Sequence, residues 1–306
     1  MMAYPVAHRT LGGFRRRPHG AANAAPTMQR RTMKGRTMDT TELCSDLDLE
    51  QEALDRVVAA LPEDDWQLPT PSPGWTIAHQ VAHLTYFDNA AATAITDPES
   101  FAEERDELFA AGLEDPTAVD DLTLSAYLAM APNDLLEAWR TGRARLAAAA
   151  EHLGDGARVE WYGPSMSGRS FLTARLMEVW AHGQDIVDAV DTAGGSAERE
   201  ATDRLRHIAH LGFVTRGWSY TVRGEQVPEG DVRLELVAPS GGQWEWGPAD
   251  TEASVRGPAQ DFCLVVTQRR HVDDTSLEVS GELATDWMRV AQAFAGGATE
   301  GPAPQL

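Results

Sequence analysis

Residues 174–190, ARLMEVWAHGQDIVDAV, decide how the sequence is interpreted. Glu178, His182 and Asp185 fall at i, i+4 and i+7, so they share one stripe of the helix that the apolar spacing predicts. The apolar side chains leave little circumference for solvent, and a buried carboxylate without a partner is costly. We therefore expect this stripe to be at least partly buried. The apolar side chains are Leu176, Val179, Trp180, Ile186 and Val187.

The spacing of Glu178 and His182 suits a metal ion, because side chains four apart on a helix can direct an oxygen and a nitrogen to one point. Zinc, nickel, iron and manganese all accept such ligands. A third ligand must come from another helix, and the helix predicted at 77–95 offers His79 and His83, again four apart. Two helices with inward polar pairs are the usual geometry of a metal site in a helical bundle.

The apolar pattern predicts a helical bundle at 38–220 followed by a small α/β domain at 221–306. Helices are expected at 41–61, 77–95, 132–153, 170–193 and 202–222, with a looser charged segment at 98–120 and a connector at 157–170. In the second domain, 232–248 predicts a β-hairpin around Gly241 and Gly242. Short strands are expected at 253–257 and 277–281, and helices at 258–270 and 284–296.

The formal net charge of -21 is spread unevenly along the chain. Residues 1–38 carry eight basic and no acidic side chains, so the remainder holds 18 basic against 47 acidic ones. We expect residues 1–37 to be a disordered basic leader, either a targeting peptide or sequence upstream of a true start near Met38. The acidic body argues against nucleic acid as a partner.

Two further features bear on the compartment. The sequence has no apolar run of about 18 residues, so no membrane span is predicted. Cys44 and Cys263 lie far apart inside helical patterns. This cysteine usage predicts a reducing, cytoplasmic compartment without a disulfide framework.

Two motifs resemble signatures of a known family. TPSPGWTIAHQVAHL (70–84) and RLMEVWAHGQDI (175–186) resemble the DinB-like bundle of mycothiol-dependent maleylpyruvate isomerases. RGPAQDFCLVVTQRR (256–270) is similar to a segment of their C-terminal, sterol-carrier-protein-like domain. The resemblance covers residues 38–296 and is closest to an actinobacterial branch of the family that is described as metal-binding. It implies a DinB-like four-helix bundle followed by a small sterol-carrier-protein-like α/β domain.

The resemblance also implies a site. It gives His83, Glu178 and His182 as ligands of a divalent metal, which is zinc in the isomerase, with mycothiol as thiol cosubstrate. Three protein ligands leave one coordination position open, which is the catalytic pattern. It further gives Arg269, beside Arg270, as a catalytic residue that binds a substrate carboxylate. The alternative is that both arginines end an ordinary helix and interact with its dipole.

Several other polar residues could belong to the metal site or have a purely structural role. His79 is a competing metal ligand. Asp185, and less so Asp88, would either orient a ligating imidazole or be solvated near a helix end. His207 and His210 would either form a second metal site or be partly exposed helical histidines. Trp75 is expected to be a packing anchor at the rim of the bundle.

The function predicted from these residues is that of a cytoplasmic, divalent-metal-binding enzyme. It would be a mycothiol-dependent isomerase or S-transferase acting on a small electrophilic molecule. One alternative is a non-catalytic, metal-containing protein whose α/β domain binds an apolar small molecule. A third is hydrolysis by a metal-bound water with Asp185 as the base. The sequence carries no signal for an oligomeric state.

Overall fold

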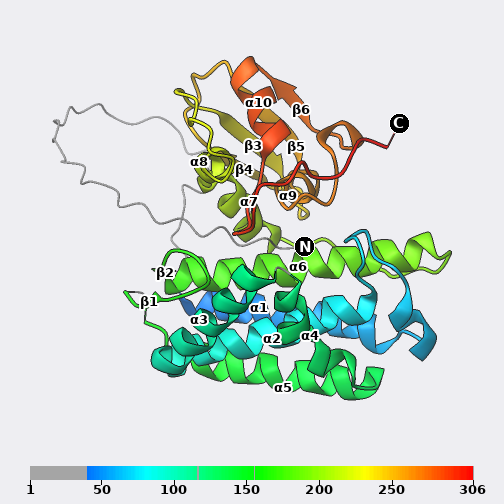
Figure 1. Ribbon diagram of the computed structural model, residues 1–306. Helices are drawn as coiled ribbons and strands as arrows, with labels where there is room; N and C mark the ends of the chain where they lie inside the picture. Colours follow the sequence, from blue (N-terminus) through cyan, green and yellow to red (C-terminus); the bar gives the residue numbers. More distant parts are fainter. Residues whose placement is uncertain (1–39, 116, 155, 306) are drawn as a thin grey trace.

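The computed structural model describes residues 40–115, 117–154 and 156–305. The predicted leader at 1–37 and the start near Met38 lie outside the described residues. The chain forms a helical part, α1 to α6, with a small sheet domain stacked on the α6 side (Figure 1). This arrangement confirms the predicted order of a mainly helical part followed by a smaller mixed part.

Four long helices lie side by side in the helical part and position the site (Figure 1). They are α1 (Thr40–Ala59), α2 (Ile77–Thr96), α5 (Pro132–Ala150) and α6 (Gly168–Thr192). Each corresponds to a predicted helix, with no end shifted by more than three residues. Helix α2 packs against both α5 and α6, so polar residues of α2 and α6 can meet between the helices.

The prediction of a loose segment at 98–120 was wrong. This region holds α3 (Pro98–Glu114) and α4 (Ala118–Leu128), which pack against α2. Asp97 caps α3 by accepting a hydrogen bond from the Ser100 backbone N–H at 3.1 Å, and Pro98 occupies the first turn. Only Phe101 and Leu108 of α3 are buried, so its apolar stripe is too narrow to stand out in a charged sequence.

The loops between the long helices contain short regular elements. The segment before α2 includes a 3₁₀-helix, η1 (Glu63–Gln67), and the connector before α6 forms the antiparallel pair β1 (Arg158–Val159) and β2 (Met166–Ser167). Thr76 begins α2 with a capping box in which the partner side chain is His79.

The single helix predicted at 202–222 is in fact two helices. They are α7 (Leu205–Val214) and α8 (Arg216–Thr221), separated at Thr215, whose φ of -89° and ψ of 9° leave the helical region. The Thr215 hydroxyl donates to the Leu211 carbonyl at 2.7 Å, a bond that competes with the backbone ladder.

The sheet domain contains the predicted hairpin. Strands β3 (Arg233–Val237) and β4 (Gln243–Trp246) are antiparallel, and Gly241 takes the positive φ of 83° that their turn requires. Strand β5 (Ser254–Pro258) lies parallel to β3, and β6 (Glu278–Ser280) antiparallel to β5, giving the order β4-β3-β5-β6. Both short predicted strands are therefore confirmed.

Helices follow β5 and β6 but are shorter than predicted. Helix α9 (Ala259–Val266) ends where Gln268 adopts a φ of 58°, and the Arg269 N–H then reaches back to the Leu264 carbonyl at 2.8 Å. A 3₁₀-turn, η2 (Val272–Asp274), precedes β6, and α10 (Glu282–Val290) follows it. The turn after α9 directs the following arginines toward α6.

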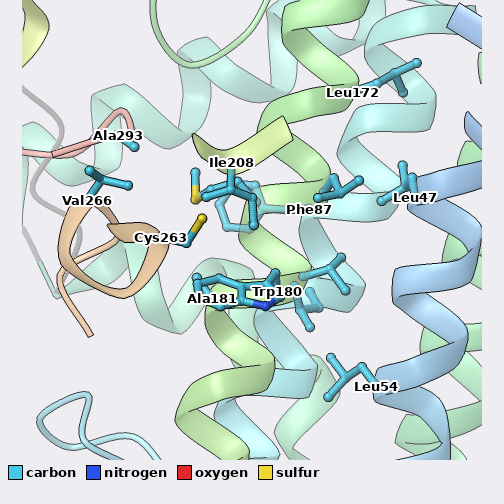
Figure 2. Close-up of a cluster of buried hydrophobic side chains, with 14 of the residues drawn as sticks. Leu47, Leu54, Phe87, Leu172, Trp180, Ala181, Ile208, Cys263, Val266 and Ala293 are labelled. Atoms are coloured by element: carbon cyan, nitrogen blue, oxygen red, sulfur yellow. The ribbon is translucent and has the colours of Figure 1, made fainter. Parts of the chain in front are cut away.

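One continuous apolar core joins the two parts (Figure 2). It runs from Leu54 of α1 and Trp180 of α6 through Ile208 of α7 to Cys263 and Val266 of α9. Helix α7 is thus packed between α6 and α9. Across the described residues, no helix has both the length and the apolarity needed to cross a membrane.

Candidate metal centre

The structure brings His83 of α2 together with Glu178 and His182 of α6. One ligand atom from each lies within 4.8 Å of the other two. Glu178 Oε2 is 3.5 Å from His83 Nε2 and 3.0 Å from His182 Nε2. Both imidazoles are nearly buried, at 4% and 5% exposure. The three residues predicted as ligands therefore converge on one point.

A chain of hydrogen bonds fixes which nitrogen of His182 carries its proton. The Trp75 carbonyl can only accept, so the Thr70 hydroxyl donates to it at 3.0 Å. The Thr70 oxygen then accepts from Gln80 Nε2 at 2.9 Å, which turns Gln80 Oε1 toward His182 Nδ1, 2.5 Å away. In the neutral imidazole Nδ1 is thus the donor, and Nε2 presents a lone pair toward Glu178.

The charge states of the other two residues also suit a cation. Burial, followed by the nearby His182 ring, lowers the pKa of His83 to about 3, so its imidazole is neutral. Burial alone would raise the pKa of Glu178, but contact with His182 and His83 takes that pKa well below its usual range. Two imidazoles and one carboxylate form a ligand set that fits zinc and similar divalent ions.

Trp75 forms a wall of this cluster, which the prediction of a rim anchor did not include. Its ring stacks on His182 at 6.1 Å with an interplanar angle of 21°, and lies 5.3 Å from the His83 ring. The loop before α2 therefore both covers the imidazoles and supplies the carbonyl that ends the Gln80 chain. Helical spacing could not place a loop residue there.

Asp185 is buried, so of its two interpretations the solvated one does not hold. It accepts from Arg269 Nε and Nη2 at 3.1 and 2.8 Å and from the Ser72 hydroxyl at 3.2 Å. Its Oδ2 is 3.9 Å from His182 Nδ1, which is close for charge interaction but too long for a hydrogen bond. Asp185 therefore lies beside the ligand without bonding to it.

Arg269 crosses from the sheet domain to α6. Besides Asp185, its guanidinium bonds through Nη1 to the Thr267 carbonyl at 2.7 Å. Arg270 makes a parallel pair with Asp188, with both bonds at 2.7 Å. A substrate carboxylate would have to compete with Asp185 for Arg269, and the catalytic role of Arg269 stays a prediction.

His79 and Asp88 have other bonding partners. His79 Nδ1 accepts from the Thr76 N–H at 3.2 Å in the capping box of α2, and His79 is not in the cluster. Asp88 is fully buried and accepts from three side chains, which makes it an anchor between helices. These donors are Gln51 Nε2, Trp139 Nε1 and Arg175 Nη2, at 3.2, 3.1 and 2.9 Å.

His207 and His210 also bond to separate partners. His207 Nε2 lies 2.8 Å from Asp46 Oδ2 of α1, whereas His210 Nδ1 accepts from Trp246 Nε1 of β4 at 3.2 Å. Among the described residues, neither histidine belongs to a cluster of three possible ligands. The structure thus explains both as links between elements.

A cavity of about 310 Å³ adjoins the cluster, with His83 and Glu178 in its wall. Its other sides come from the connector at 161–166, from α7 and α8, and from residues 293–295. The cluster therefore has an adjacent space large enough for a small molecule.

The chain is similar to known proteins in both sequence and fold. Residues 47–187 match the family described as mycothiol maleylpyruvate isomerase N-terminal domain, a range that includes all three clustered residues. An uncharacterised protein of Mycobacterium tuberculosis, found in two strains, is 44% identical over 258 residues, covering 84% of this chain and 97% of the relative.

Solved structures give the same fold. Two crystal structures of the mycothiol-dependent maleylpyruvate isomerase, one of them of a mutant, superpose on this chain with a TM-score of 0.50. The superposition includes 87% of this chain and 97% of each isomerase chain. Their sequence identities of 19% and 20% establish the fold alone. By the match of residues 47–187, the chain belongs to the family of the mycothiol maleylpyruvate isomerase N-terminal domain.

Proposed function

We propose that His83 Nε2, Glu178 Oε2 and His182 Nε2 hold a divalent metal ion, with zinc as the best fit to two imidazoles and one carboxylate. The observation that carries the proposal is the convergence of three side chains from two helices, with one ligand atom of each within 4.8 Å of the other two.

The family membership supports a thiol-dependent isomerase or S-transferase with mycothiol as the cosubstrate. When bound, the divalent ion would keep the thiol sulfur deprotonated. In an isomerisation, the sulfur adds to one carbon of a conjugated C=C bond and the π pair moves onto the carbonyl group. After rotation, the pair returns and expels the thiolate, so no atom is gained or lost.

The residues around the cluster would support this chemistry by holding its geometry. Gln80 keeps the His182 tautomer, and Trp75 limits the movement of both rings. We propose that Arg269 acts through Asp185, as a positioning residue for the ligand helix. Family membership favours this enzyme over a non-catalytic protein that binds an apolar ligand.

The finer architecture is part of the same proposal. We propose a DinB-like four-helix bundle at 38–220 and a sterol-carrier-protein-like domain at 221–306, in a cytoplasmic protein. Neighbouring helices α1, α2, α5 and α6, together with the mixed sheet, support this assignment.

Metal analysis of purified variants tests the proposal. The wild type and His152→Ala, which removes an exposed histidine far from the cluster in sequence, should retain a stoichiometric divalent metal. His83→Ala and His182→Ala should lose it, and the cobalt-loaded wild type should change its absorption spectrum when mycothiol is added. Metal that persists in both cluster variants, or a cobalt spectrum unaffected by mycothiol, would overturn the proposal.

A further inference from the structure

The cavity beside the cluster has an unusual wall for a family known by a dicarboxylate substrate. Most of its lining is aromatic or aliphatic and comes from elements far apart in the sequence. The largest apolar contributors are Phe87, Trp161, Phe171, Met177, Trp218 and Phe294. Its volume of about 310 Å³ lies at the small end of the range for small-molecule sites, about 300–1,000 Å³.

The cavity also lacks an uncompensated positive charge. Arg175 is the one arginine among the described lining residues, and its Nη2 is paired with the buried Asp88 at 2.9 Å. Arg269 and Arg270 are paired with acids of α6 and do not line the cavity. A divalent ion in the cluster would be balanced by Glu178 and a bound thiolate, so it leaves no net charge for an anionic substrate.

We propose that the substrate is an uncharged, mainly apolar electrophile of one ring or a short chain, and not a small dicarboxylate. Its apolar body lies along the aromatic wall, and its electrophilic carbon faces the end formed by His83 and Glu178. A carboxylate placed there would lose its hydration without gaining an unpaired cation, because Arg175 is already paired with Asp88. The buried Nε–H of Arg175 has no hydrogen-bond partner among the described residues and can donate to the carbonyl oxygen of an uncharged ligand. The assignment of this ligand as substrate rests on the proposed function, whereas its binding preference does not.

Calorimetry on the zinc-loaded full chain tests the preference with a matched pair. Benzylacetone and hydrocinnamate share a phenylethyl body but end in a methyl ketone and a carboxylate, and neither has a C=C bond conjugated with its carbonyl group to which a thiol could add. We expect benzylacetone to bind at least 10-fold more tightly than hydrocinnamate, and succinate to bind most weakly. Equal or tighter binding of either anion, or no binding of benzylacetone, would overturn the proposal.

Each titration is run on the zinc-loaded protein saturated with mycothiol, whose own binding is measured first, and again on the metal-free protein. If mycothiol does not bind, the proposed function fails, while the preference measured on the metal-free protein still stands or falls separately. A preference for benzylacetone that appears in both titrations supports the assignment of an uncharged ligand. A preference for hydrocinnamate under either condition contradicts it.

A charge added at the cavity rim locates the binding site. Val214 lines the cavity and is 57% exposed, so Val214→Arg should fold. The added cation favours hydrocinnamate, so the ratio of benzylacetone affinity to hydrocinnamate affinity should fall at least 10-fold. Leu122→Arg is the control, since Leu122 of α4 is 59% exposed and lies outside the cavity lining. An unchanged ratio in Val214→Arg, or an equal change in both variants, would refute binding in this cavity.

Discussion

Replacing Gln80 by leucine tests how far the metal cluster depends on a residue that is not itself a ligand. The side chain of Gln80 is fully buried, and its Oε1 accepts from His182 Nδ1 at 2.5 Å. Leucine has a similar volume but no acceptor. The substitution therefore removes the group that holds His182 with its Nε2 lone pair toward Glu178, and leaves the three proposed ligands in place.

The expected size of the effect follows from the surroundings of His182. Loss of a hydrogen-bond partner behind a metal ligand typically weakens metal binding by about 10–100-fold. The carboxylate of Asp185 is 3.9 Å from the same nitrogen, so a small shift would give Nδ1 a replacement acceptor. We therefore expect a loss near 10-fold, or about 1.4 kcal/mol.

Zinc affinity is measured by competition with a chromophoric chelator. Gln51→Leu serves as the control, because Gln51 is equally buried and loses one bond, to Asp88, away from the ligands. Both variants should lose about 1–3 kcal/mol of unfolding free energy, but only Gln80→Leu should bind zinc more weakly. Gln80→Glu, which keeps an acceptor, should bind at least as well as the wild type. Wild-type affinity in Gln80→Leu would refute the reasoning.

Three further predictions concern the helices around the cluster. Hydrogen bonding to α5 arginines lowers the pKa of Asp55, so its stabilisation is complete above the unfolded pKa of about 3.9 and is lost as the pH falls through the lower folded value. Urea titrations should show Asp55→Asn about 2 kcal/mol less stable than the wild type at pH 7, with this difference shrinking as the pH falls below about 4. A difference that stays constant as the pH falls would contradict this. Gly183→Ala should lower the free energy of unfolding by about 1–3 kcal/mol in the same assay, because the added Cβ would lie 1.9 Å from Arg199 Nη1. An unchanged free energy of unfolding would mean that the Arg199 side chain moves away freely. Arg269→Ala should lower zinc affinity by up to about 10-fold, and by more than Arg270→Ala does. The reason is that Asp185, the partner of Arg269, lies 3.9 Å from the His182 imidazole, whereas Arg270 pairs with Asp188. Equal losses of zinc affinity in the two variants would exclude the positioning role.

The proximity of Glu178 and His182 could be predicted because its information is local. Glu178 and His182 are one turn apart, so helix geometry alone places them together. The choice of His83 over His79 needed the family resemblance, and the structure supplies the physical reason. His79 lies in the first turn of α2, where its imidazole caps the helix with Thr76.

The surroundings of the site could not be predicted in the same way. Gln80 is three residues before His83 and could have been noticed by helical spacing, but its role depends on Thr70 and Trp75 in a loop. The cavity wall combines Trp161 of the connector with Trp218 of α8, which no periodic pattern relates. The break between α7 and α8 lies at Thr215, where the backbone leaves the helical region, and the apolar spacing does not mark it.

Helix α6 couples the two parts of the protein to the cluster. One stripe holds Glu178 and His182, and the next turn supplies Asp185 to an arginine of the sheet domain. Since α7 and α8 also form cavity wall, the sheet side of the molecule contacts both the ligand helix and the space for the substrate. A shift of the sheet domain would therefore move the wall and disturb His182 through Asp185 at the same time.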